Sequence, residues 1–143
     1  KTYRLSAAER ATRAAALFDG LAQLEGGAKL TLHYTDVMPA LAIVAVTRGG
    51  NHIFNHVVGA DARGLPVVKP DALEQALSIY ADELLSPVYL GWVRGYQDEQ
   101  RAAFEKAAGT SAALKAIQIL HPREAFAAVA KGLRDPAHAD WLD

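Results

Sequence analysis

Apolar residues recur at helical spacing over residues 7–24, alternate with polar residues from residue 29, and return to helical spacing after residue 71. Ser6 and Glu9 flank the start of the first helical stretch at the spacing of a capping box. The pattern predicts an N-terminal helix that begins at Ser6, then a block of strands, then further helices.

The strand-type sequence lies mainly in residues 29–58. Residues 29–36 alternate like a half-buried strand, and residues 40–47 form an almost unbroken apolar run, typical of a strand covered on both faces. A turn sequence follows this run, so we expect residues 40–47 and 52–58 to form a hairpin. Residues 65–68 form either a short fourth strand, placed on an edge by its proline, or an extended lead into the next helix.

After residue 71, proline and glycine positions divide the helical pattern into four to five helices. One of them, predicted to begin at Pro87, carries an aromatic stripe with Tyr89 and Trp92. Because the strands cluster instead of alternating with helices, we predict one α+β domain over residues 1–143. In it a three- to four-stranded antiparallel sheet packs against the N-terminal helix and the C-terminal helices. Trp141, near the end of the chain, needs an apolar seat on this chain or on a partner.

Composition narrows the function classes. Lysine and arginine number 15 against 16 aspartates and glutamates, so the net charge of −1 does not favour nucleic acid or an acidic membrane surface as partner. The lack of cysteine excludes disulfides and thiol chemistry. Neither an apolar run of the ~20 residues that span a bilayer nor a signal peptide is visible, so we expect a cytoplasmic protein. An alanine-rich, lysine-poor sequence suggests a bacterial or phage gene.

The histidines are the main candidates for chemistry. On a helix, His52 and His56 would be neighbours and could share a metal ion. On the predicted strand they share a face but stand about 13 Å apart at ~3.3 Å per residue, too far to bind one ion. We therefore expect no metal site and no cofactor. His33 and Asp36, at the end of a predicted strand, could supply a general base and the carboxylate that orients it.

Two functional hypotheses follow. The first is a non-catalytic binding or regulatory module that contacts a protein partner, or a second copy of itself, through an aromatic helix face; its candidate residues are Tyr89, Trp92, Arg94 and Tyr96. The alternative is a small enzyme with a general acid–base site on the sheet face, formed by His33, Asp36, His52 and His56. The enzyme requires His33, His52 or His56 to converge with Asp36 in a pocket, whereas the binding module requires an exposed aromatic patch around Trp92.

Overall fold

The computed structural model describes residues 3–24, 27–30, 33–49 and 52–142, and only the backbone within 27–30 and 33–36. Helices and strands follow one another in an α+β order. They are α1 (Ala7–Ala22), β1 (Gly27–Leu30), β2 (His33–Asp36), β3 (Leu41–Val44), β4 (Val58–Ala60), β5 (Pro66–Val68), α2 (Pro70–Ile79), η1 (Ala81–Glu83), β6 (Tyr89–Trp92), α3 (Asp98–Ala108), α4 (Ala112–Lys115), β7 (Gln118–Leu120), α5 (Pro122–Arg134) and η2 (Pro136–Leu142).

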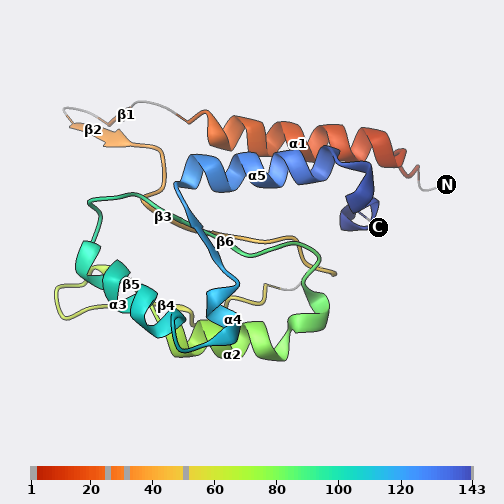
Figure 1. Cartoon of the computed structure of the whole chain (residues 1–143). Helices are drawn as coiled ribbons and strands as arrows, with labels where there is room; N and C mark the ends of the chain where they lie inside the picture. Colours follow the sequence, from red (N-terminus) through yellow and green to blue (C-terminus); the bar gives the residue numbers. More distant parts are fainter. Residues whose placement is uncertain (1–2, 25–26, 31–32, 50–51, 143) are drawn as a thin grey trace.

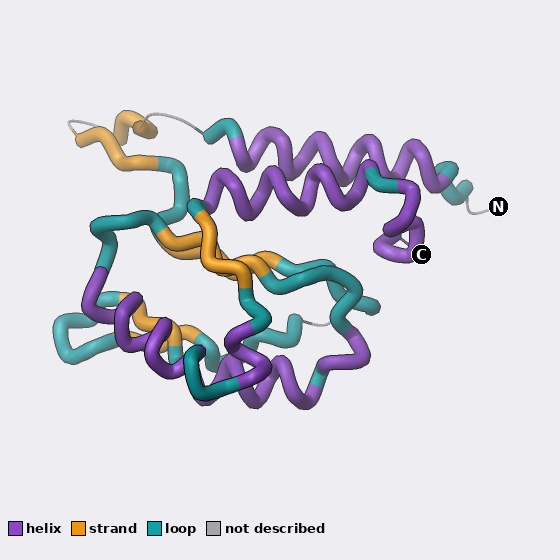
Figure 2. Tube along the Cα trace, in the orientation of Figure 1, coloured by secondary structure: helices purple, strands orange, loops and turns teal. Residues whose placement is uncertain are grey.

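The central sheet has the strand order β3-β6-β7 in the described part of the chain (Figures 1 and 2). Strand β6 runs antiparallel to β3, with Leu41 opposite Trp92, and parallel to β7, with Tyr89 opposite Gln118. All four residues of β6 are buried, as expected for a middle strand with a layer on each face. Two separate antiparallel pairs, β1–β2 and β4–β5, complete the strands.

Side chains of the central sheet alternate between two hydrophobic cores, because successive strand residues point to opposite faces. Val44 and Tyr89 belong to a core that is shared with α1 and α5. Leu90 and Trp92 belong to a second core, which is shared with α2, α3 and α4. Figure 1 shows the same arrangement, with α1 and α5 side by side on one side of the sheet and α2 and α4 on the other.

Two helices begin with a reciprocal cap. Ser6 accepts a hydrogen bond from the Glu9 backbone N–H at 3.3 Å, while the Glu9 carboxylate accepts from the Ser6 N–H at 3.0 Å. These bonds confirm the predicted capping box, and those to the Glu9 carboxylate lower the pKa of Glu9. At the start of α5, His121 and Glu124 form a second capping box, which the sequence analysis did not predict.

The α+β class, the N-terminal helix and the C-terminal helices are confirmed, but the predicted strand pairing is wrong in detail. Residues 29–36 do not form one strand, because β1 and β2 pair as a separate antiparallel ladder. The predicted hairpin of residues 40–47 with 52–58 is absent from the described residues: β3 pairs with β6, and residues 52–57 lie outside any strand. The central sheet is consequently mixed, not antiparallel. The short strand at 65–68 is confirmed as β5.

Residues 89–92 form strand β6 and not the predicted helix. Val88, Tyr89 and Trp92 favour strands, and a short apolar run fits helical and strand periods equally well. Within this strand, Gly91 faces the first turn of α5. A Cβ on Gly91 would lie 2.7 Å from the Cα of Pro122, so only glycine leaves room for this approach.

Trp141 packs against apolar residues of the same chain. Its side chain is 6% exposed, lies against Gly132 of α5, and stacks on the His138 ring at a centroid distance of 4.4 Å. Of the two possibilities left open by the sequence, a seat on this chain is therefore the observed one.

Candidate functional site

The four residues predicted to form an exposed aromatic binding face do not form one. Tyr89 is 7% and Trp92 3% exposed, and they point to opposite faces of β6. Burial raises the pKa of Tyr89. The Trp92 indole N–H donates to the carbonyl of Tyr96 at 2.8 Å. Arg94 is exposed just beyond the strand, so its guanidinium is the accessible charged group of the set.

The histidines of the predicted catalytic set lie in two different parts of the fold. His52 and His56 are exposed in the segment between β3 and β4, where His56 has a left-handed backbone with φ of 63°. The Nδ1 of His52 accepts a hydrogen bond from the Phe54 N–H at 3.0 Å. His33 and Asp36 are at the two ends of β2, and their side chains lie outside the described residues. Their pairing therefore stays a prediction.

A cavity of about 360 Å³ lies beside His52, one of the predicted catalytic histidines. Thr47, His52 and Phe54 line it together with apolar residues of β3, α1 and α5. None of the described residues that line it is acidic, so no carboxylate there orients the imidazole. The described residues also contain no group of three or more histidines, aspartates or glutamates arranged to bind a metal ion.

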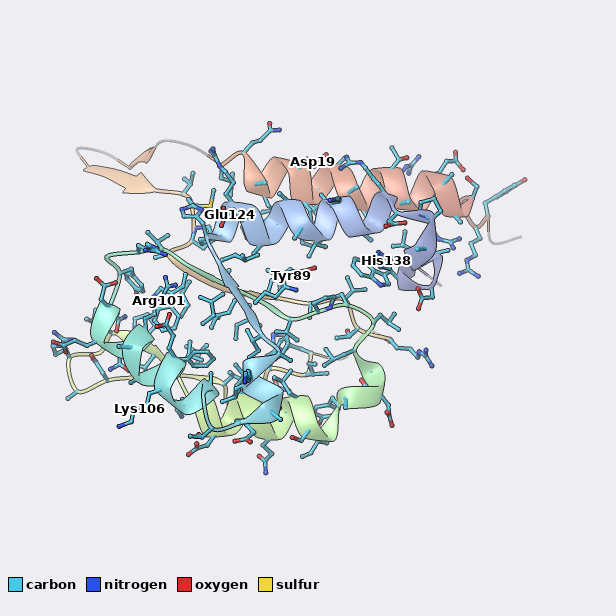
Figure 3. All side chains as sticks on the ribbon, in the orientation of Figure 1. Asp19, Tyr89, Arg101, Lys106, Glu124 and His138 are labelled. Atoms are coloured by element: carbon cyan, nitrogen blue, oxygen red, sulfur yellow. The ribbon has the colours of Figure 1, made fainter. Side chains whose placement is uncertain are left out.

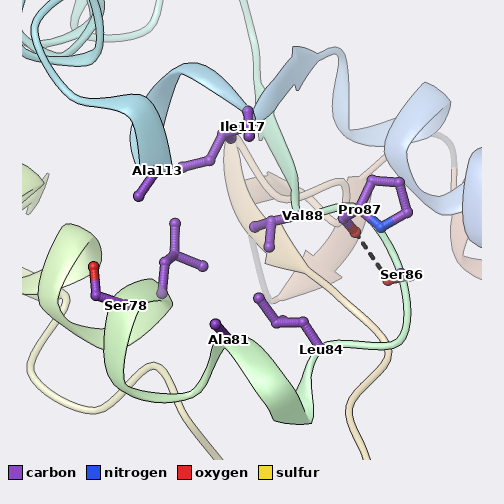
Figure 4. Close-up of a pocket in the computed structure, with 10 residues that line it drawn as sticks. Ser78, Ala81, Leu84, Ser86, Pro87, Val88, Ala113 and Ile117 are labelled. Atoms are coloured by element: carbon purple, nitrogen blue, oxygen red, sulfur yellow. Dashed lines mark hydrogen bonds between the residues drawn. The ribbon is translucent and has the colours of Figure 1, made fainter.

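The clearest apolar concavity is a groove of about 390 Å³, bounded by α2, η1, α4 and the start of β6 (Figure 4). Its walls are mainly aliphatic and include Leu77, Ala81, Leu84, Val88, Ala113 and Ile117. The Ser86 hydroxyl on its wall accepts from the Val46 N–H and donates to the Pro87 carbonyl, each at 2.8 Å. Because the Ser86 hydroxyl already donates and accepts within the fold and the other walls are mainly aliphatic, the groove offers a bound molecule chiefly apolar contacts.

Two large apolar residues lie exposed at the turn between groove residues. Ile79 is 65% and Tyr80 39% exposed, and they stand between Ser78 and Ala81, which both line the groove. Neither residue lines the groove, and exposed apolar residues are ordinary when scattered, so the groove walls carry the argument for binding here.

A second cavity, of about 450 Å³, lies at the carboxyl ends of β6 and β7, which are adjacent because the two strands are parallel. Figure 3 labels Arg101 on α3 and Glu124 on α5, which approach this end of the sheet from its two covering layers. Its lining includes Trp92, Arg94, Arg101, Ile119, His121 and Glu124. Trp92 and Arg94 were predicted as binding residues, whereas His121 and Glu124 were missed as site residues.

No family model matches this sequence, and comparisons with curated proteins and with solved structures gave no match either. None of the helices described here is long and apolar enough to cross a membrane.

Proposed function

We propose that this domain is a non-catalytic binding module that holds an apolar segment of a protein partner in the groove between α2, η1 and α4. The observation that carries the proposal is the groove itself, with its aliphatic walls. Burying such apolar surface would contribute roughly 25 cal/mol per Å² toward binding before the costs of association.

Two exposed charged residues that neighbour groove residues in the sequence suggest the chemistry of the partner segment. Asp82 is exposed on η1, next to groove residue Ala81, and Lys115 is exposed on α4, between groove residues Ala113 and Ala116. A complementary segment would present apolar side chains to the groove, a basic residue toward η1 and an acidic residue toward α4. This charge pattern orients the segment and discriminates between partners more than it adds affinity.

We also propose an origin for the gene and a cellular compartment for the protein. The alanine-rich, lysine-poor sequence supports a bacterial or phage origin. We also propose a cytoplasmic location.

A random peptide display selected against the purified protein tests the proposal. We expect selected peptides to share an apolar core flanked by one basic and one acidic residue. Ala81→Lys, which places a long charged side chain at the groove, should weaken their binding at least tenfold, or about 1.4 kcal/mol. Ala102→Lys, at an exposed alanine of α3 outside the groove lining, is the matched control and should leave binding unchanged.

Charge reversal adds a second readout. Asp82→Lys should weaken peptides with a basic flank and strengthen variants in which that flank is made acidic. Failure to select any peptide, selection without this pattern, or equal binding to Ala81→Lys and Ala102→Lys would contradict the proposal. Concentration-dependent dimerisation that Ala81→Lys abolishes would assign the groove to a second copy of this chain and would also overturn the partner we propose.

A further inference from the structure

We infer a second binding site, for a small amino or hydroxy carboxylic acid with an apolar body, in the cavity at the carboxyl ends of β6 and β7. Its volume of about 450 Å³ is in the range of small-molecule sites, and the carboxyl ends of parallel strands are where ligands bind in many open α/β sheets. The site shares no lining residue with the apolar groove, so this inference does not depend on the proposed function.

Arg94 is the group that would hold the ligand carboxylate. It is exposed, lines this cavity and an adjoining one of about 350 Å³, and forms no hydrogen bond or ion pair with the described residues. Arg101 lines both cavities as well, but its Nε donates to the Glu105 carboxylate at 2.9 Å. A guanidinium binds a carboxylate through two parallel hydrogen bonds, which the uncommitted Arg94 can supply.

The remaining charges favour a ligand with one negative charge over a phosphate dianion. Glu124 lines the main cavity, and Asp98 and Glu105 line the adjoining one. With Arg94 and Arg101, the two cavities carry two positive and three negative side chains when His121 is neutral. A dianion would face net repulsion in this setting, whereas a carboxylate needs only one guanidinium.

Glu124 supplies the contact for a ligand amine or hydroxyl. Its Oε2 accepts from the His121 backbone N–H at 3.0 Å, and its other oxygen has no hydrogen-bond donor among the described residues. His121 adds a donor: its Nδ1 accepts from the Arg123 N–H at 3.1 Å, so the neutral ring carries its proton on Nε2. Ile119 and Leu120 give the cavity an apolar wall for the body of the ligand.

Titrations followed by ¹H–¹⁵N NMR test the site with named probes. L-phenylalanine and L-phenyllactate should bind saturably with dissociation constants of about 1 mM or lower and should shift the Gly95 amide. 3-Phenylpropionate, which lacks the hydrogen-bond donor, and phenyl phosphate, a dianion, should both bind at least fivefold more weakly. Arg94→Ala should weaken phenylalanine at least tenfold, whereas Arg13→Ala, at an exposed arginine of α1, should not.

Glu124→Gln separates a binding role from a structural one. Glutamine keeps an acceptor for the His121 N–H, so the helix cap should persist, but the lost charge should weaken phenylalanine more than phenyllactate. The inference is overturned if neither probe binds by about 10 mM, if Arg94→Ala and Arg13→Ala bind alike, or if phenyl phosphate binds most tightly. Equal weakening of both probes by Glu124→Gln would likewise contradict the assigned role of Glu124.

Discussion

Pro122, the first residue of α5, lies directly over Gly91 in the middle of the central strand. A Cβ built on Gly91 would stand 2.7 Å from the Cα of Pro122 and 3.2 Å from its Cβ. Both residues are buried, and Pro122 is held by the backbone of a helix that also packs against α1. The layer formed by α1 and α5 therefore depends on this glycine for its close approach to the sheet.

Gly91→Ala should lower the free energy of unfolding by about 1–3 kcal/mol, since the added methyl meets backbone that cannot move independently. Urea denaturation monitored by circular dichroism measures the change. Gly20→Ala is the matched control, because a Cβ at Gly20 meets nothing within 4 Å and the residue lies inside α1. It should raise stability by up to about 1 kcal/mol through helix propensity. Equal effects of the two substitutions would show that α5 moves freely away from β6.

Gly132→Ala should expel Trp141 from its seat. The added Cβ would clash with two atoms at the far end of the indole ring, so the Trp141 side chain must shift. Alanine also favours the helix, so total stability is a poor measure of this change. Acrylamide quenching of tryptophan fluorescence is a better measure. The chain has two tryptophans, and Trp92 is only 3% exposed. An increase in quenching therefore reports on Trp141. Lys131→Ala, at the exposed neighbouring position, should leave quenching unchanged.

The sequence predicted the parts of the fold that depend on local interactions. Ser6 and Glu9 cap α1 as their spacing indicates, because both partners lie within one helical turn. The order of the central sheet depends instead on contacts between distant segments. Strand β3 pairs with β6, far along the chain, and not with the next segment after its turn. Periodicity in residues 89–92 fits a helix and a buried strand alike, so it could not reveal this partner.

Only single residues of the candidate sites could be predicted, because the sites too depend on contacts between distant segments. Trp92 and Arg94 were chosen for an aromatic helix face, yet they meet the second cavity because β6 ends there. His121 carries a local signal, since it precedes Pro122 and forms a capping box with Glu124. Its place in the site depends on the parallel pairing of β7 with β6, a contact that no local sequence signal predicts. The apolar groove joins four separate segments and has no single sequence signature.

Acid should weaken the link between α1 and α5. Asp19 accepts hydrogen bonds from both terminal nitrogens of Arg134, and these bonds lower the pKa of Asp19. A carboxyl whose pKa is lower in the folded state stabilises the fold above its unfolded pKa of about 4, and this contribution is lost as pH falls through the folded pKa. The unfolding free energies of wild type and Asp19→Asn should therefore differ at neutral pH and converge once the pH falls below the folded-state pKa of Asp19.

Arg134→Gln provides the complementary arm of this test. The side chains of Asp19 and Arg134 are both about half exposed. The unfolding free energy of Arg134→Gln should therefore be only slightly lower than that of wild type, and the gap should shrink further in high salt. Combining Asp19→Asn with Arg134→Gln should cost less than the sum of the single changes, as expected for a direct pair. A stability difference that persists unchanged at low pH would exclude the carboxylate–guanidinium pair as its source.

Ser86 should stabilise the contact between the segment after β3 and the segment before β6, which forms part of the groove wall. Its hydroxyl is the acceptor for the Val46 N–H, and the residue is 8% exposed. Ser86→Ala leaves that N–H without its acceptor, which should cost about 1–3 kcal/mol in urea denaturation. Ser78→Ala, at an exposed serine on the opposite side of the groove, should change stability by no more than about 0.5 kcal/mol. Hydrogen exchange at Val46 gives the local readout: faster exchange in Ser86→Ala, with protection restored by Ser86→Thr, identifies the bond, whereas unchanged exchange would refute it.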